Sequence, residues 1–409
     1  MSGWKRNLYI LMICQFLVMS AMTMIMPFLP LYLQELGVND PAAVGLWAGV
    51  IFGANFLTAF LFSPFWGRLA DRYGRKMMIL RSGFGMALIV SLTGFATGPV
   101  SLLLLRLANG VIAGFIPASI GLVATNTPKE KAGHALGLLQ AGTVAGAICG
   151  PLIGGVLAQA FGFRMIFFVT GTGLLVATLV VFFFVRESFT PAEVTEKTNT
   201  WQEWKQITGH RPVLAIYFVI FFIQLAIMGV NPLLSIFVEE LTSPEQAALF
   251  AGLAVSVLGF GNMLGSSQLG KLGDKVGAHH VLIYALLGAA CFSIPLAFVT
   301  EVWQLICLRF FIGLCLGGLL PCANTLIRLH APGGMESRTY GFSNSAMYLG
   351  NMLGPVLGGS VVATAGVRGL FLISALLLLG NVLLVKKKVI PPASRRFRAE
   401  QQRNQKALS

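Results

Sequence analysis

Long apolar stretches, each about as long as a membrane is thick, recur along almost the whole of this chain. A helix needs about 20 mostly apolar residues to cross the hydrocarbon core of a bilayer. Only 11% of the 409 residues are charged, against about 25% in a typical soluble domain. Backbone groups in hydrocarbon find no partner outside their own segment, so these stretches must be helices. The sequence therefore predicts an all-helical, multi-pass membrane protein and excludes a soluble enzyme, a nucleic-acid binder or a disordered chain.

Twelve such segments are expected, with boundaries that hold to within a few residues. They lie at about residues 8–33, 43–66, 77–96, 100–125, 133–160, 163–186, 211–238, 246–269, 279–298, 302–328, 339–364 and 367–386. A longer polar stretch separates the first six from the last six. The predicted units are residues 1–186, a cytoplasmic linker at 187–210, a second unit at 211–388 and a basic cytoplasmic tail at 389–409.

The basic residues occupy alternate loops and so predict an orientation. The formal net charge is +14, but the basic residues sit in short caps between apolar runs rather than in a nucleic-acid-binding patch. Basic loops of membrane proteins stay in the cytoplasm. Both termini are therefore expected to be cytoplasmic. Only Arg164 and Arg368, at the outer starts of two segments, depart from this rule.

The two halves of the chain repeat one another with an offset of 203 to 205 residues. The matching pairs are Gly67–Gly74 with Gly270–Gly277, Arg106–Gly114 with Arg309–Gly317, Gly146–Gly155 with Gly350–Gly359, Pro27 with Pro232, and Glu35 with Glu240. Several motifs repeated in the same order indicate an internal duplication. Two pseudo-symmetric six-helix bundles are therefore expected, a plan in which transporters bind substrate near the midplane between the bundles.

The chain resembles the major facilitator superfamily over nearly its whole length, apart from the tail. The run G-R-L-A-D-R-Y-G-R-K at residues 67–76 is similar to that superfamily's signature between helices 2 and 3. The run at 146–155 resembles the helix 5 signature of its drug:proton antiporters. Residues 26–32, 63–67 and 270–274 are similar, more narrowly, to bacterial multidrug exporters. The resemblance implies the major facilitator fold, in a bacterial plasma membrane, with alternating access and export of small amphipathic compounds against protons.

The same resemblance implies a conformational latch on the cytoplasmic side. Asp71 would contact the cytoplasmic start of helix 11, near residues 337–339, and so hold the two bundles together. The residues expected to form the latch are Gly67, Asp71, Arg72, Gly74, Arg75 and Asp274. The alternative is that these charges only set the topology.

Arg106 is a basic residue six or seven positions inside the fourth segment. A charge at that depth is costly and usually faces protein or water. By resemblance it belongs to the proton-coupling signature of helix 4, and the residues expected to couple protons are Arg106, Asp71 and Glu35. The alternative is that Arg106 extends to the outer surface. Arg309 is its equivalent in the second half, and both alternatives apply to it equally.

Small residues and a proline recur together in the fifth and eleventh segments. The antiporter motif is expected to comprise Gly146, Gly150, Pro151, Gly154, Gly155, Gly354 and Pro355. Small residues at every fourth position let helices approach closely, and proline can bend a helix. By resemblance, this motif forms a hinge or a seal that favours exchange over leakage.

Uncharged polar residues within the segments are the candidates for lining a substrate cavity. They are Gln15, Thr23, Asn55, Asn109, Gln140, Gln224, Asn231, Asn324, Asn344 and Tyr348. Bonding between helices is as good an explanation for each one singly. No acid lies in the middle of a segment, which suits a neutral, anionic or lipid-like substrate. A lipid or glycolipid flippase, or an exporter of one metabolite such as a sugar, is the alternative function.

The sequence offers no chemistry for an enzyme. The six cysteines show no C-x-x-C spacing, and the five histidines lie near loops, so neither a catalytic cluster nor a metal site is expected. No G-x-x-x-x-G-K-[ST] run occurs, which argues against direct use of ATP. The expected partners are a small amphipathic substrate, protons and the lipid bilayer. No cofactor is expected, and nothing demands more than a monomer.

Overall fold

The computed structural model describes residues 3–128, 131–187, 207, 209–332 and 335–389, and its regular elements are helices. The side chains of Asp71, Asp274 and residues 336–338 lie outside the described part. The first half contains α1 (Gly3–Met24), the 3-10 turn η1 (Met26–Phe28), α2 (Leu29–Glu35), α3 (Pro41–Tyr73), α4 (Arg75–Thr93), α5 (Pro99–Ile112), α6 (Phe115–Asn126), α7 (Ala132–Phe161) and α8 (Phe163–Phe184). The second contains α10 (Arg211–Val230), η3 (Asn231–Leu233), α11 (Leu234–Leu241), α12 (Pro244–Val276), α13 (Ala278–Ser293), η4 (Pro295–Phe298), α14 (Val302–Gly317), α15 (Leu319–His330), α16 (Glu336–Leu384) and the π-helical turn η5 (Val385–Val389).

Eleven stretches of the described chain are long and apolar enough to cross a membrane, so the protein is a multi-pass membrane protein. They coincide with the predicted segments to within several residues, except that the last two form one run, Thr339–Val389. This run of 51 residues would be about 75 Å long as a straight helix, more than twice the hydrocarbon thickness. It breaks at Gly366, whose φ of 69° and ψ of 176° are not helical and suit a residue without a Cβ.

Several other apolar runs are also interrupted by short irregular turns. Proline at the first or second position opens η1 and η3, and proline cannot donate the backbone hydrogen bond that a continuous helix needs. Gly114 separates α5 from α6 with a φ of 154°. Each interrupted run still counts as one candidate span, which agrees with the predicted segments.

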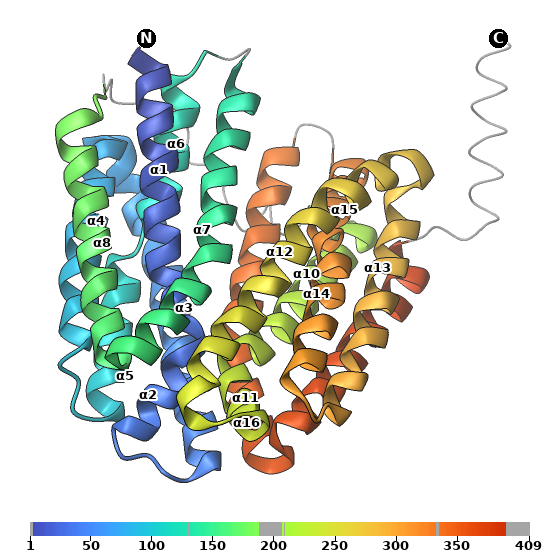
Figure 1. The fold of residues 1–409 in the computed structure, drawn as a ribbon. Helices are drawn as coiled ribbons and strands as arrows, with labels where there is room; N and C mark the ends of the chain where they lie inside the picture. Colours follow the sequence, from blue (N-terminus) through green and yellow to red (C-terminus); the bar gives the residue numbers. More distant parts are fainter. Residues whose placement is uncertain (1–2, 129–130, 188–206, 208, 333–334, 390–409) are drawn as a thin grey trace, which may run out of the picture.

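Two groups of helices make up the molecule (Figure 1). The helices α1 to α8 pack mainly against one another, as do α10 to α16. We call the end at which the chain begins the basic end, because it also carries Arg72, Arg75 and Lys76, and we call the other end, with Glu35, the opposite end. Figure 1 shows the groups close together at the opposite end and farther apart at the basic end.

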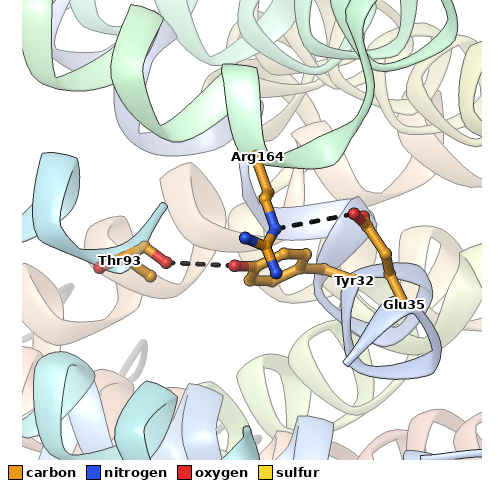
Figure 2. Close-up of polar contacts among 4 residues, drawn as sticks. All are labelled: Tyr32, Glu35, Thr93 and Arg164. Carbon is orange, nitrogen blue, oxygen red and sulfur yellow. Dashed lines mark hydrogen bonds and ion pairs between the residues drawn. The ribbon is translucent and has the colours of Figure 1, made fainter. Parts of the chain in front are cut away.

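Arg164, one of the two exceptions to the charge rule, ties together helix ends at the opposite end (Figure 2). Its Nε lies 3.8 Å from the Glu35 carboxylate at the end of α2. Beside it, the buried Tyr32 donates a hydrogen bond of 3.3 Å to the carbonyl oxygen of Thr93, the last residue of α4. The start of α8 and the ends of α2 and α4 are thereby joined.

Arg368, the second exception, does the same in the other half. Its Nη1 donates to the carbonyl oxygen of Ala297 at 3.0 Å, and its guanidinium lies 5.4 Å from the centroid of the Phe237 ring. Ala297 follows Thr93 by 204 positions and Phe237 follows Tyr32 by 205. Arg164 and Arg368 therefore serve helix packing in equivalent places, and this explains why basic residues occur on that side.

Candidate functional site

The two halves meet along two pairs of helices, α3 with α16 and α7 with α12. The contacts are made by backbone, since a Cβ added at Gly49 would strike the carbonyl oxygen of Pro355, and one added at Gly252 would strike that of Pro151. A Cβ at Gly155 would lie 2.9 Å from the carbonyl oxygen of Ala248. Glycine is required at such close approaches, so these positions form a tight seam between the halves.

The Gly-Pro motif has a second face that points into its own half. A Cβ at Gly154 would lie 2.6 Å from the carbonyl oxygen of Met24 on α1, and Gly146 and Gly150 pack against the same helix. In the second half, Gly350 and Gly354 pack against α10 in the same way. The predicted tight packing therefore serves two partners at once: the glycine row holds α7 and α16 inside their halves, while Pro151 and Pro355 face the other half. Both helices continue through their proline.

A polar bridge joins the halves at the opposite end. The side-chain nitrogen of Gln34 on α2 donates a hydrogen bond of 3.1 Å to the carboxylate of Glu239 on α11. The two residues are 205 positions apart, so they occupy equivalent places in the two repeats. The neighbouring turns η1 and η3 also contact each other. The opposite end is thus closed by symmetric elements of both halves.

The basic end shows the reverse situation. A Cβ at Gly67 on α3 or at Gly341 on α16 would meet no atom within 4 Å. The apolar side chains of Leu61 and Phe65, in the last turns of α3, are exposed. Together with the arrangement in Figure 1, this indicates that the halves are joined toward the opposite end and parted toward the basic end.

The predicted cavity residues fall into classes by burial. The exposed ones are Gln140, Asn324, Asn344 and Tyr348, the half-buried ones are Thr23 and Asn55, and the buried ones are Gln15, Asn109, Gln224 and Asn231. Among the described side chains, Gln15 is fully buried with no partner for either amide atom, whereas Asn109 donates to Asn55 at 2.9 Å. Asn231 lies inside the second half, where its side-chain oxygen accepts a hydrogen bond from Arg309.

Arg106 lies half-buried on α5. Its Nε and Nη2 are buried and have no hydrogen-bond partner in the described part of the chain. Asn109, one turn along the same helix, has a buried and unpaired side-chain oxygen. A guanidinium cannot lose its charge in a protein, so Arg106 remains a cation inside α5.

The turn between α3 and α4 is held by a residue that the sequence analysis missed. The Glu187 carboxylate, just beyond α8, accepts hydrogen bonds from the backbone nitrogens of Arg75 (3.0 Å) and Lys76 (2.7 Å) at the start of α4. An acid at a helix N-terminus satisfies free N–H groups and the helix dipole. The signal was present, since Glu187 is the first acid after the sixth segment, but its partner is 112 residues away.

The predicted latch can be followed only in part. Gly74 has a φ of 91° at the turn between α3 and α4, as a tight turn requires. Arg72 is exposed, with its guanidinium 5.3 Å from the centroid of the Tyr73 ring. The side chains of Asp71, Asp274 and residues 337–338 lie outside the described part, so the contact of Asp71 with the start of α16 stays a prediction.

Comparison with known proteins gives one consistent family. The profile of the Major Facilitator Superfamily matches residues 11–250 and 216–409. The chain is 39% identical to the multidrug resistance protein MdtG of Proteus mirabilis, over 93% of this chain and 95% of that one. It is 40% identical to MdtG of Dickeya zeae, over 92% and 93%. Among solved structures, an inward-facing bacterial homologue of the human lysosomal transporter Spinster superposes with a TM-score of 0.77 and 16% identity, over 94% of this chain and 96% of that one.

Proposed function

This chain belongs to the Major Facilitator Superfamily, and from that premise we propose that it is a secondary active transporter that exports small amphipathic compounds in exchange for protons. It is a transporter rather than an enzyme. Its similarity to MdtG over more than nine-tenths of both chains supports multidrug efflux as its activity. The relatives come from bacteria, which supports the bacterial plasma membrane as its location.

The observation that carries this proposal is the seam between the halves. Gly49, Gly155 and Gly252 press backbone against backbone toward the opposite end, while the halves part at the basic end (Figure 1). Alternating access needs two halves that close at one end and open at the other. With the basic end in the cytoplasm, this conformation is open inward, like that named for the Spinster homologue.

The proposed architecture has twelve spans in two six-helix bundles. The run Thr339–Val389 supplies two of them, because Gly366 breaks it near its middle. The bundles comprise residues 1–186 and 211–388, joined by the linker at 187–210 and followed by the basic tail. An even number of spans leaves both termini on the same side of the membrane, which the distribution of basic residues makes the cytoplasmic side, and a monomer suffices for this plan.

The exposed polar candidates support a substrate without a strong positive charge. Gln140, Asn324, Asn344 and Tyr348 are all uncharged. No acid that would attract a cation occurs in the middle of a predicted segment. The same observation favours a lipid or glycolipid flippase as the second candidate, because a lipid-like molecule also suits a neutral cavity.

A vesicle experiment tests the proposed function. We expect purified protein in sealed liposomes to move an amphipathic dye only when a pH gradient is imposed, and to release protons when dye is added. A pH gradient without dye movement, combined with movement of a fluorescent lipid between leaflets, would decide for the flippase. If neither cargo moves, export of a single metabolite replaces both.

The latch gives a separate prediction. We propose that Asp71 contacts the start of α16 when the basic end closes, because an anion stabilises a helix N-terminus. Asp71→Asn should therefore slow dye export about threefold to tenfold, on the basis of a partly buried interaction worth about 1 kcal/mol, while the amount of protein in the membrane stays unchanged. The measurement is initial transport rate per folded protein, with Asp40→Asn, an exposed acid at the opposite end, as the control. Equal rates for both variants would remove the latch.

A further inference from the structure

Arg309 is a buried cation inside the second half, and no acid among the described residues pairs with it. Its side chain is 3% exposed. Nη2 donates a hydrogen bond of 2.7 Å to the side-chain oxygen of Asn231, whereas Nε is buried without a partner among the described residues. Within the described part of the chain, the neutral amide of Asn231 is the one hydrogen-bond partner of Arg309, so the charge is not compensated. Burying a charge in a medium of low dielectric is unfavourable unless the charge is paired.

Arg309 lines a cavity between α10, α12, α13, α14 and α16. The centre of a water-sized sphere can move through about 30 Å³ of this cavity. On the same scale, one water molecule needs about 10–15 Å³. It therefore holds a few water-sized species and no drug-sized molecule. Its walls are mostly apolar, with Asn231, Ser293 and Ser374 as the polar residues and Arg309 as the one charged residue.

No acidic side chain among the described residues lines this cavity, and several of its groups can donate a hydrogen bond. Arg309 Nε–H is free, and the amide nitrogen of Asn231 and the hydroxyl of Ser374 donate to no described residue. Ser293 already donates to the carbonyl oxygen of Ala289 at 2.7 Å. A cation and several donors in a small apolar enclosure complement a monatomic anion. We propose that this cavity binds one monovalent inorganic anion, chloride under ordinary conditions, as the counter-ion of Arg309.

The first half lacks this site, although its sequence repeats the arginine. Arg106 is equivalent to Arg309, but position 26, the equivalent of Asn231, is Met. Asn231 belongs to η3, which contacts η1 of the first half at the closed opposite end. An anion that fixes Arg309 and Asn231 thereby stabilises the element that closes this end.

Thermal unfolding of the purified full-length protein in detergent tests the site directly. Chloride is titrated against gluconate at constant ionic strength, and bromide is tested in the same way. We expect the Tm to rise along a saturating curve, by about 2 °C or more at ten times the dissociation constant. Bromide should act like chloride, because both are monatomic and monovalent. A Tm that is the same in chloride and in gluconate means that water fills the cavity and overturns the proposal.

Three single-residue variants test whether the bound anion lies in this cavity. R309M should lose the chloride response, and R106M should keep it, since only Arg309 lines the cavity. S374A, which removes one donor and leaves the charge, should raise the half-saturating chloride concentration several-fold and keeps the test decisive if R309M does not fold. A response that persists unchanged in S374A and R309M, or that is lost in R106M, locates the ion elsewhere and overturns the proposal.

Discussion

Gly252→Leu should strongly reduce dye export while the protein still folds and inserts into the membrane. Gly252 on α12 faces the backbone of Pro151 on α7, so a side chain there meets a carbonyl oxygen that cannot move aside. Packed interfaces do not deform gradually, and the halves must separate at the opposite end instead. The transporter would then be held open to that side, and export should fall about tenfold or more. Gly49→Leu, at the equivalent seam against Pro355, should behave alike.

Accessibility distinguishes this locked state from a general loss of structure. A cysteine introduced at Val356, which lies next to Gly49 and Gly53 in the seam, should react with a membrane-impermeant maleimide from the opposite side faster in the Gly252→Leu background than in the unchanged protein. Gly137→Leu is the matched control, because a side chain at Gly137 on α7 meets no atom within 4 Å. Normal export by Gly252→Leu, or equal loss in both variants, would contradict the proposed seam.

Arg106→Met should uncouple protons from dye. The guanidinium is deep in α5 with two unpaired nitrogens, and a cation within about 4–6 Å lowers the pKa of an acid by about one to three units. We propose that an acid approaches Arg106 during the transport cycle, and without the guanidinium that acid holds its proton more tightly. Dye-evoked proton release at neutral pH should therefore fall about tenfold or more, whereas dye binding should change little. Proton release in liposomes and dye binding by fluorescence measure the two effects separately.

Two further variants make this result specific. Arg106→Lys keeps the charge and should retain part of the coupling. Arg328→Met removes an exposed charge in the last turn of α15 and should leave coupling intact. If Arg106→Met releases protons like the unchanged protein, the arginine acts in packing alone, and the coupling must be sought at other residues, such as Glu35.

The sequence by itself determined the helical segments and the repeat. Each segment is recorded locally, by about 20 consecutive apolar residues and by the glycine or proline at which it breaks, as at Gly366. The Gly-Pro motif likewise predicted close packing, because a row of small residues lets a neighbouring helix approach closely. The exceptional positions of Arg164 and Arg368 were visible too, although their purpose was not.

The tertiary structure alone decided which faces meet. A glycine row indicates that a helix approaches a neighbour closely. It does not indicate that Gly150 of α7 packs against α1, whereas Gly155 of the same helix packs against α12 in the other half. Glu187 capping α4, Gln34 bridging to Glu239, and Asn231 bound to Arg309 rather than placed between the halves all join residues 78 to 205 positions apart. Hydropathy and spacing act along one segment, whereas these contacts depend on the rotation and register of separate helices, which no single segment encodes.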